Sequence, residues 1–212
     1  EPRSAVPVGS PVAALSGTEQ RRLLRDGLPL PPYFTYPEVE RELRRAHPPR
    51  AQQGLVVFMT GLSGAGKSTI AQVLAKLAQT IGYQITIIDP RSAFTADSRF
   101  DASIVETAWP ETALKTFAPD PFTAVVTLTH VGHIDDEALA ISLRSPCRYI
   151  GALGSRKTHA KRVERLIALG FTDTDIARIK SPVGLNIGAE TPAEIAVAIL
   201  GEVIAAFRGG KH

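Results

Sequence analysis

Short runs of β-branched residues alternate with helical patterns from Gly54 onward, and this alternation constrains the fold more than any other feature of the chain. The apolar runs predict buried strands at residues 55–59, 84–88, 124–128 and 148–150. The intervening patterns predict helices at residues 67–80, 111–117, 135–143, 156–169, 172–179 and 192–207. Strands joined through helices run parallel, so we expect an α/β fold in which helices cover both faces of a doubly wound, mostly parallel sheet. Ligands of such sheets bind at the carboxyl ends of the strands.

The N-terminal segment differs in composition, because nine of the sixteen prolines lie within the first fifty residues. Proline disfavours a sheet interior, so we expect an irregular, partly helical extension there. Helical patterns run from Ser16 through Leu24 and from Pro37 to Ala46. We therefore divide the chain into a proline-rich extension, residues 1–52, and a nucleotide-binding domain, residues 53–208.

Composition excludes several classes of protein. With 44% hydrophobic residues among 212, the chain can bury a sizeable core, which excludes wholesale disorder. A formal charge of +3 does not favour nucleic acid as a partner, and no apolar run reaches the length of a membrane span. The single cysteine, Cys147, cannot form an intrachain disulfide, so we expect a cytoplasmic protein. Whether the chain forms a homodimer is left open.

The segment between the first strand and the first helix of this domain has the phosphate-binding pattern GxxxxGK[ST]. Its backbone N–H groups would surround phosphates, Lys67 would add a positive charge, and Ser68 would offer a ligand to the Mg²⁺ of ATP. The alternative interpretation is a glycine-rich turn that allows tight strand-to-helix packing. The pattern is carried by Gly61, Gly64, Gly66, Lys67, Ser68 and Thr69.

Asp89 ends the second predicted strand, about twenty residues beyond the glycine loop. Rossmann-like, dinucleotide-binding folds place there the acid that accepts a ribose hydroxyl, and Arg91 beside it would suit a 2′-phosphate. Alternatively, Asp89 caps a turn before Pro90. The choice between ATP with Mg²⁺ and NAD(P) as the nucleotide therefore stays open.

Catalysis is less well supported than binding. Phosphoryl transfer also needs a carboxylate that holds Mg²⁺, and no acid directly follows the predicted strand 124–128. Asp135 and Asp136 come several residues later. Whether the chain is an enzyme is therefore undecided, and no catalytic residue is assigned.

His130, His133, Asp135 and Asp136 form a polar cluster after the same strand. Imidazole and carboxylate groups both ligate Zn²⁺ or Mn²⁺, so a metal site is one interpretation. We favour the other, a polar loop with Asp135 at a helix N-terminus, and predict no metal site. His130, which is nearest the strand end, is kept as a residue that lines the ligand site.

A second glycine-containing turn follows the strand 148–150 and opens another helix. Small residues permit close approach of a ligand, and basic residues supply charge, as in an anion site. A plain strand-to-helix turn with a solvated basic start is the alternative. The candidate ligand contacts here are Gly151, Gly154, Ser155 and Arg156.

The chain resembles two unrelated families in succession. The segments LSGTEQRRLLRDGLPLPPYFTYPEVERELRRAHPPR and GLVVFMTGLSGAGKSTIAQVLA resemble the junction of a bacterial bifunctional ATP sulfurylase/adenylylsulfate (APS) kinase, whose loop binds ATP. This resemblance covers residues 15–75. An APS kinase continues with a strand that ends in LDGD, whereas this chain has IIDPRSAF.

Residues 78–208 resemble the C-terminal Rossmann domain of the XdhC/CoxI family, accessory proteins of xanthine dehydrogenase and related molybdenum hydroxylases. The matching stretches are GYQITIIDPRSAF, AVVTLTH, YIGALGSRKTHAKRVERL and PVGLNIGAETPAEIAVAIL. The family implies a nucleotide-binding module that helps to deliver the molybdenum cofactor to an apoenzyme. The resemblance implies ligand contacts at Asp89, Arg91, His130, Gly151, Gly154, Ser155 and Arg156.

The two resemblances join at residues 71–78, inside one predicted helix. The apolar pattern of that helix is continuous, so we expect the hybrid to fold. An XdhC-like accessory protein is the first functional hypothesis. An APS kinase-like phosphotransferase and an inactive hybrid are the alternatives.

Overall fold

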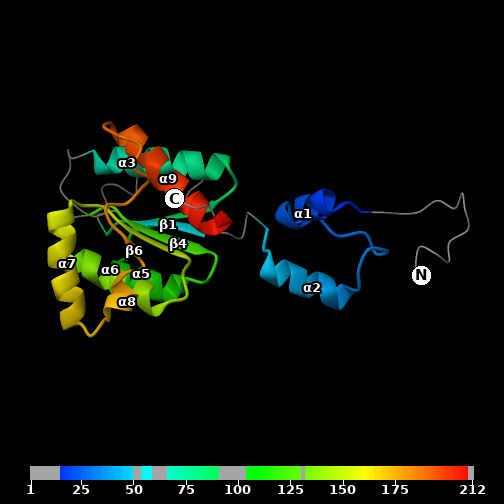
Figure 1. The fold of residues 1–212 in the computed structure, drawn as a ribbon, viewed down its shortest axis with the longest axis horizontal. Coiled ribbons are helices and arrows are strands. Elements are labelled where there is room, and N and C mark those ends of the chain that lie inside the picture. Colours follow the sequence, from blue (N-terminus) through cyan, green and yellow to red (C-terminus); the bar gives the residue numbers. More distant parts are fainter. Residues whose placement is uncertain (1–14, 50–53, 59–65, 91–103, 130–131, 210–212) are drawn as a thin grey trace, which may run out of the picture. The chain divides into compact units, whose positions relative to one another are not determined.

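The computed structural model describes residues 15–49, 54–58, 66–90, 104–129 and 132–209. The chain divides into two compact units, Glu1–Ala51 and Gln52–His212, and each is described by itself. Figure 1 labels the helices and strands of both units.

The N-terminal unit contains two helices. α1 spans Gly17–Arg25, and its N-cap Ser16 accepts a hydrogen bond from the Glu19 N–H at 3.1 Å. α2 spans Pro37–Ala46 and begins with proline, whose missing N–H would have no partner in the first turn. Both helices lie where the sequence predicts them.

A six-stranded sheet forms the centre of the C-terminal unit, in the order β3-β2-β1-β4-β5-β6. The strands are β1 Gly54–Phe58, β2 Gln84–Ile88, β3 Ile104–Glu106, β4 Thr123–Thr127, β5 Tyr149–Ala152 and β6 Ile179–Lys180. Every pair of neighbouring strands is parallel. The chain builds outward from β1 to β3 and then crosses to the other side of β1. This is the doubly wound order of dinucleotide-binding folds, so the predicted fold class is confirmed.

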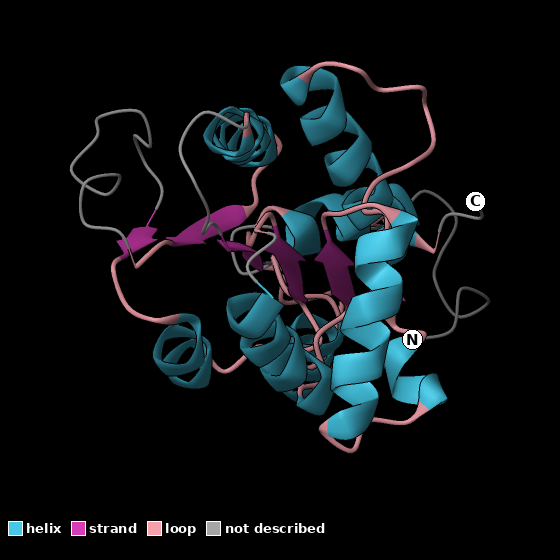
Figure 2. Ribbon diagram, turned by 90° about the vertical axis from the view of Figure 1, so that its left-hand side faces the viewer, coloured by secondary structure: helices cyan, strands magenta, loops and turns pink. Residues whose placement is uncertain are grey.

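Helices cover both faces of this sheet (Figures 1 and 2). α3 and α9 pack on one face, and α5, α6, α7 and α8 pack on the other. Their bounds are α3 Lys67–Thr80, α5 Pro110–Phe117, α6 Gly132–Arg144, α7 Arg156–Ala168, α8 Asp173–Ile176 and α9 Pro192–Arg208.

Alternate residues of β4 serve the two core layers, because successive side chains of a strand point to opposite faces. Val126 packs with Leu74 of α3 and Ile199 of α9. Val125 belongs to the opposite layer, with Leu114 of α5. All five residues of β4 are buried, as expected for a central parallel strand.

The predicted helix at residues 172–179 is wrong in extent. α8 ends at Ile176, and Ile179–Lys180 forms the edge strand β6 beside β5. The helix begins as predicted, because Thr172 and Asp175 form a reciprocal capping box. A strand of two residues is too short to show the alternation that would identify it in the sequence.

Other differences concern the lengths of elements. β3 was not predicted, since its three residues carry little periodicity. β5 extends to Ala152 instead of ending at residue 150, and α6 begins at Gly132 instead of residue 135. These shifts lie at element ends, where local sequence signals are weakest.

α3 is continuous across residues 71–78, where the two sequence resemblances join. Its buried face consists of Ile70, Ala71, Leu74, Ala75 and Ala78. The apolar spacing therefore runs through the join without a break. In the part of the chain that the structure describes, none of the helices is both long enough and apolar enough to cross a bilayer.

Candidate functional site

The predicted ligand-binding segments follow strands at one edge of the sheet, because parallel strands end on the same side. In the sheet register, Phe58 of β1 lies between Ile88 of β2 and Thr127 of β4. The order of the strands reverses between β1 and β4. Doubly wound folds bind their ligands at this switch point.

α3 begins where the glycine-rich turn after β1 ends. Gly66 is the N-cap residue, in the left-handed conformation with φ of 71°, and none of the described side chains caps the helix. A Cβ atom at Gly66 would lie 3.2 Å from Cγ of Pro192, so Gly66 packs closely against the start of α9. The first turn of α3 has no acidic residue. Its N-terminal dipole is therefore suited to an anionic group.

The structure describes part of the GxxxxGK[ST] pattern. Gly61 and Gly64 lie outside the described residues. Lys67 is the first residue of α3; Ser68 is partly exposed and Thr69 is exposed. Phosphate binding by these residues stays a prediction.

Asp89 directly follows β2, and only 1% of its surface is exposed. Its backbone N–H donates a hydrogen bond to the carbonyl oxygen of Glu106 at 3.0 Å, which continues the pairing of β2 with β3. Asp89 therefore lies at the carboxyl end of the strand next to β1, where Rossmann folds place their ribose-binding acid. The ribose contact stays a prediction, and Arg91 lies outside the described residues.

Hydrogen bonds to β4 and at the start of α7 hold the turn after β5. The N–H of Leu153 donates to the carbonyl oxygen of Thr127 at 2.8 Å. Gly154 has φ of 139°, and a Cβ there would lie 3.2 Å from Cγ2 of Thr158. Ser155 then caps α7 by accepting a hydrogen bond from the Thr158 N–H at 3.2 Å. The exposed Arg156 opens α7 directly after this turn.

Gly151 lies within β5 and is buried. A Cβ at this position would lie 2.5 Å from Cγ2 of Val183 and 2.8 Å from Cε1 of Tyr149. The missing side chain therefore lets the segment after β6 cross close to β5. This packing accounts for glycine at this position without a ligand.

A buried ion pair lies beside the turn after β5. Arg162 of α7 and Asp135 of α6 are each 1% exposed, and Nη2 of Arg162 lies 3.3 Å from Oδ2 of Asp135. The same Nη2 donates to the carbonyl oxygen of Leu153 at 3.1 Å, and Nη1 donates to Oγ of Ser181 at 3.4 Å. Burial raises the pKa of Asp135 to about 7, although the positive charge of Arg162 and a hydrogen bond with the Thr129 side chain act in the opposite direction.

A second pair joins the same two helices. Nη2 of Arg165 donates to Oδ1 of Asp136 at 3.1 Å, and its Nε donates to the other carboxylate oxygen. Asp135 and Asp136 are thus both engaged by arginines of α7. His130 lies outside the described residues. Among the residues that the structure describes, no group of three or more His, Cys, Asp or Glu side chains could hold a metal ion.

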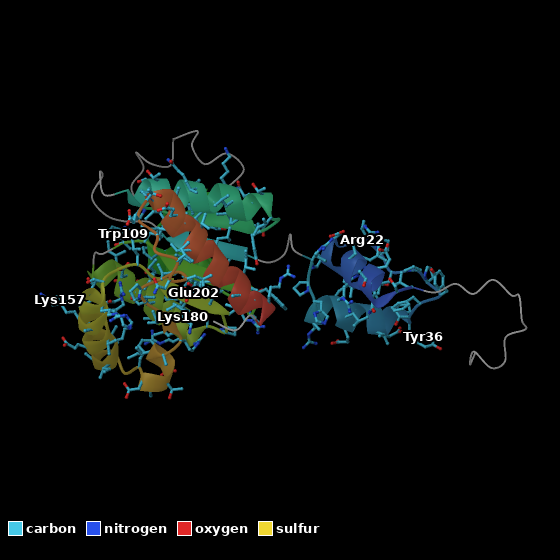
Figure 3. All side chains as sticks on the ribbon, turned by 45° about the horizontal axis from the view of Figure 1, so that its top comes forward. Arg22, Tyr36, Trp109, Lys157, Lys180 and Glu202 are labelled. Carbon is cyan, nitrogen blue, oxygen red and sulfur yellow. The ribbon has the colours of Figure 1, made fainter. Side chains whose placement is uncertain are left out.

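The segment between β6 and α9 is held by Glu202, which Figure 3 labels on α9. Oε2 of Glu202 accepts hydrogen bonds from the Tyr149 hydroxyl at 2.6 Å and from the Gly184 N–H at 2.8 Å. Burial and the neighbouring carboxylate both raise the pKa of Tyr149, so its hydroxyl stays a donor. These bonds tie the segment to β5 and to α9.

Sequence reasoning missed Arg162 and Glu202, because it searched the turns and not the helices. A signal for Arg162 was present: it precedes Leu166 by four residues and therefore lies on the buried face of α7. An arginine on an apolar helix face has to find polar partners inside the protein. Nothing comparable marks Glu202, whose partners come from distant segments.

Comparison with protein families gives one match over most of the chain. Residues 62–203 match the XdhC Rossmann domain. The match begins within the glycine loop, so it includes α3 as well as everything from β2 to most of α9.

Curated relatives match a shorter part of the chain. The sulfate adenylyltransferase of Yarrowia lipolytica is 46% identical over 88 residues, which is 41% of this chain and 15% of that protein. The sulfate adenylyltransferase of Emericella nidulans is 43% identical over 88 residues, with the same coverage. The chain thus spans about 15% of the length of these relatives.

A solved structure supports the fold. The crystal structure of a xanthine dehydrogenase from Bacillus halodurans is 28% identical and superposes with a TM-score of 0.62. The superposition covers 78% of this chain and 45% of that one. The sequence therefore has relatives in two families, as its motifs predict.

Proposed function

Because the chain belongs to the XdhC Rossmann domain family, we propose that it is a nucleotide-binding accessory module for the maturation of a molybdenum-cofactor enzyme of the xanthine dehydrogenase type. The positions of α3 and Asp89 support the proposal that the chain binds a nucleotide. They follow β1 and β2, the two strands whose ends bind pyrophosphate and ribose in Rossmann folds.

In this proposal the nucleotide phosphates lie at the N-terminus of α3. Lys67 supplies a positive charge to them, and Ser68 ligates Mg²⁺ when ATP is the nucleotide. Asp89 accepts a ribose hydroxyl. NAD(P) uses the same two positions without the metal ion.

The molybdenum cofactor enters this proposal as the cargo of maturation, and a cytoplasmic molybdenum hydroxylase apoenzyme is the partner. The family match supports both parts of this proposal. The superposition on a protein described as a xanthine dehydrogenase supports the same assignment.

A second candidate function is an ATP-dependent phosphotransferase that resembles APS kinase. The identity to sulfate adenylyltransferases and the GxxxxGK[ST] pattern favour it. The pairing of Asp135 and Asp136 with arginines weakens it, because both of these carboxylates already neutralise a guanidinium charge. We therefore rank phosphoryl transfer second.

Thermal unfolding with ATP–Mg²⁺, NAD and NADP tests nucleotide binding. A ligand that binds only the folded state at 100 times its Kd adds about 2.7 kcal/mol to the free energy of unfolding, so a rise of several degrees in Tm is expected. Lys67→Ala and Asp89→Ala should each reduce this rise. Lys76→Ala is the matched control, since Lys76 is an exposed lysine farther along α3. Unchanged shifts in both site variants would refute the placement.

A coupled assay with ATP and APS separates the two candidate functions. Turnover by the wild type that is lost in Lys67→Ala would place phosphoryl transfer first. A correctly folded sample that binds none of the three nucleotides would instead support the inactive hybrid.

A further inference from the structure

Arg162 is the largest fully buried side chain among the described residues. Taking a guanidinium group out of water is costly unless protein groups replace its hydrogen bonds. The partners of Arg162 are therefore informative, and they come from three separate parts of the chain. They are the carbonyl oxygen of Leu153, the carboxylate of Asp135 and the hydroxyl of Ser181.

Each of these partners belongs to a segment that follows a different strand. Asp135 lies in the first turns of α6, which follows β4, and Leu153 directly follows β5. Ser181 directly follows β6. One cation thus joins the segments after three neighbouring strands at the edge of the sheet where the ligand is proposed to bind.

The bond to Leu153 has a particular consequence for the turn after β5. Gly154 follows with φ of 139°, a conformation that L-residues rarely adopt, and Ser155 then caps α7. A hydrogen bond to the Leu153 carbonyl fixes the orientation of the peptide group between Leu153 and Gly154. The direction of the backbone into α7 depends on that peptide group.

We infer that Arg162 is a positioning residue, whose guanidinium holds the start of α6 and the segments after β5 and β6 in the one arrangement that binds the nucleotide. The inference rests on the proposed nucleotide site. In this proposal Arg162 does not itself contact the nucleotide. A guanidinium is required because its planar fork presents several N–H donors in fixed, divergent directions, whereas a lysine ammonium is a single point charge.

The second arginine of α7 supplies a matched control. Arg165 pairs with Asp136 and donates to the carbonyl oxygen of Lys161 within α7, and its side chain is 42% exposed. It joins the same two helices, and within the described parts of the chain its hydrogen bonds go only to α6 and α7. A general effect of α6–α7 ion pairing would therefore appear in variants of both arginines.

The experiment compares Arg162→Lys with Arg165→Lys in the full chain. Both substitutions keep the positive charge and therefore disturb the fold less than a neutral residue would. Amide hydrogen exchange is measured at Leu153, Thr158 and Gly184, each of which donates a hydrogen bond in or near these turns. Val126 in central β4 reports exchange through global opening. NAD and ATP–Mg²⁺ affinities are measured on the same samples by calorimetry.

In Arg162→Lys we expect exchange at Leu153 and Thr158 to become at least 10-fold faster relative to Val126, and nucleotide Kd to rise at least 10-fold. Arg165→Lys should change each by less than 3-fold. Exchange that stays unchanged in Arg162→Lys, or that rises equally at Val126, would overturn the inference. If the wild type binds neither nucleotide, the proposed function fails, while the exchange data still decide whether Arg162 holds the turns.

Discussion

The helices α3 and α7 follow segments of similar composition, and their described N-terminal ends differ. Both segments lead from a parallel strand into a helix through glycine and small residues. Before α3, Gly66 supplies no capping side chain. Before α7, Ser155 caps the helix, and Arg162 binds the Leu153 carbonyl from within the protein. Among the described residues, the start of α3 therefore has no capping side chain, whereas the turn before α7 is held by groups of the protein and acts as a scaffold.

The largest expected effect tests the internal support of the turn after β5. Arg162→Met removes a buried cation and leaves the Asp135 carboxyl and the Leu153 carbonyl without this donor. Breaking one side of a buried pair costs about 3–5 kcal/mol. Arg165→Met, at the partly exposed pair, should cost less than about 1 kcal/mol. Urea denaturation measures both, and equal losses would contradict the distinction.

The next effect is a pH dependence of the same support. The folded pKa of Asp135 is about 7, whereas the ordinary pKa of an aspartate is 3.8, so the folded state binds more protons than the unfolded state between these values. The contribution of Asp135 to stability is therefore fully present below pH 3.8 and is lost as pH rises through about 7. Between pH 5 and pH 8 this group should lower the free energy of unfolding by roughly 2–3 kcal/mol.

Asp135→Asn isolates the pH-dependent contribution of Asp135 to the free energy of unfolding, because asparagine does not titrate. The difference in unfolding free energy between the variant and the wild type should grow in favour of the variant as pH rises from about 5 to 8. His159 acts with the opposite sign, since burial and Arg162 lower its pKa, and it is present in both proteins. A difference that is constant with pH would show that Asp135 does not titrate in this range.

Alanine substitutions at the glycines of the two turns should have a smaller effect. Gly66 and Gly154 have positive φ and a neighbouring side-chain atom 3.2 Å from the position of a Cβ. We expect each substitution to cost about 1–2 kcal/mol from backbone strain, with an added cost of contact. Gly170→Ala is the control, since φ is 87° and nothing lies within 4 Å of the Cβ position. Thermal unfolding that ranks Gly170→Ala as the most costly would contradict the role of the contacts.

The smallest expected effect concerns the cap of α7. Ser155→Ala removes the acceptor of the Thr158 N–H and should destabilise the protein by about 1 kcal/mol. Ser155→Thr keeps a hydroxyl and should retain most of the stability. If nucleotide affinity falls in Ser155→Ala by more than the change in stability explains, then the Ser155 hydroxyl contacts the ligand in addition to capping α7.

Several features were predictable because they rest on local signals. The apolar spacing of α3, the capping residues of α7 and α9, and the buried runs of β2 and β4 all lie within one element. β3 and β6 were not predictable, since strands of three and two residues exist only because a neighbouring strand pairs with them.

The residues of the candidate site also fall into a group that the sequence predicts and a group that it does not. Gly66, Asp89 and Gly154 follow predicted strands, so their common edge of the sheet follows from the parallel topology. Arg162 and Glu202 lie within helices, and their roles depend on partners that are 9 to 53 residues away in the chain. No pattern of local spacing identifies such partners.

By itself, the sequence determined the doubly wound α/β class, the family resemblances and the edge of the sheet where a ligand is expected. These depend on periodicity, on turn chemistry and on the rule that parallel strands end together. The pairing of Asp135 and Asp136 with arginines, the packing role of Gly151 and the bonds of Arg162 to three segments are visible only in the folded protein. Such roles arise when distant polar groups are buried together and must satisfy one another, a requirement that appears only after the chain has folded.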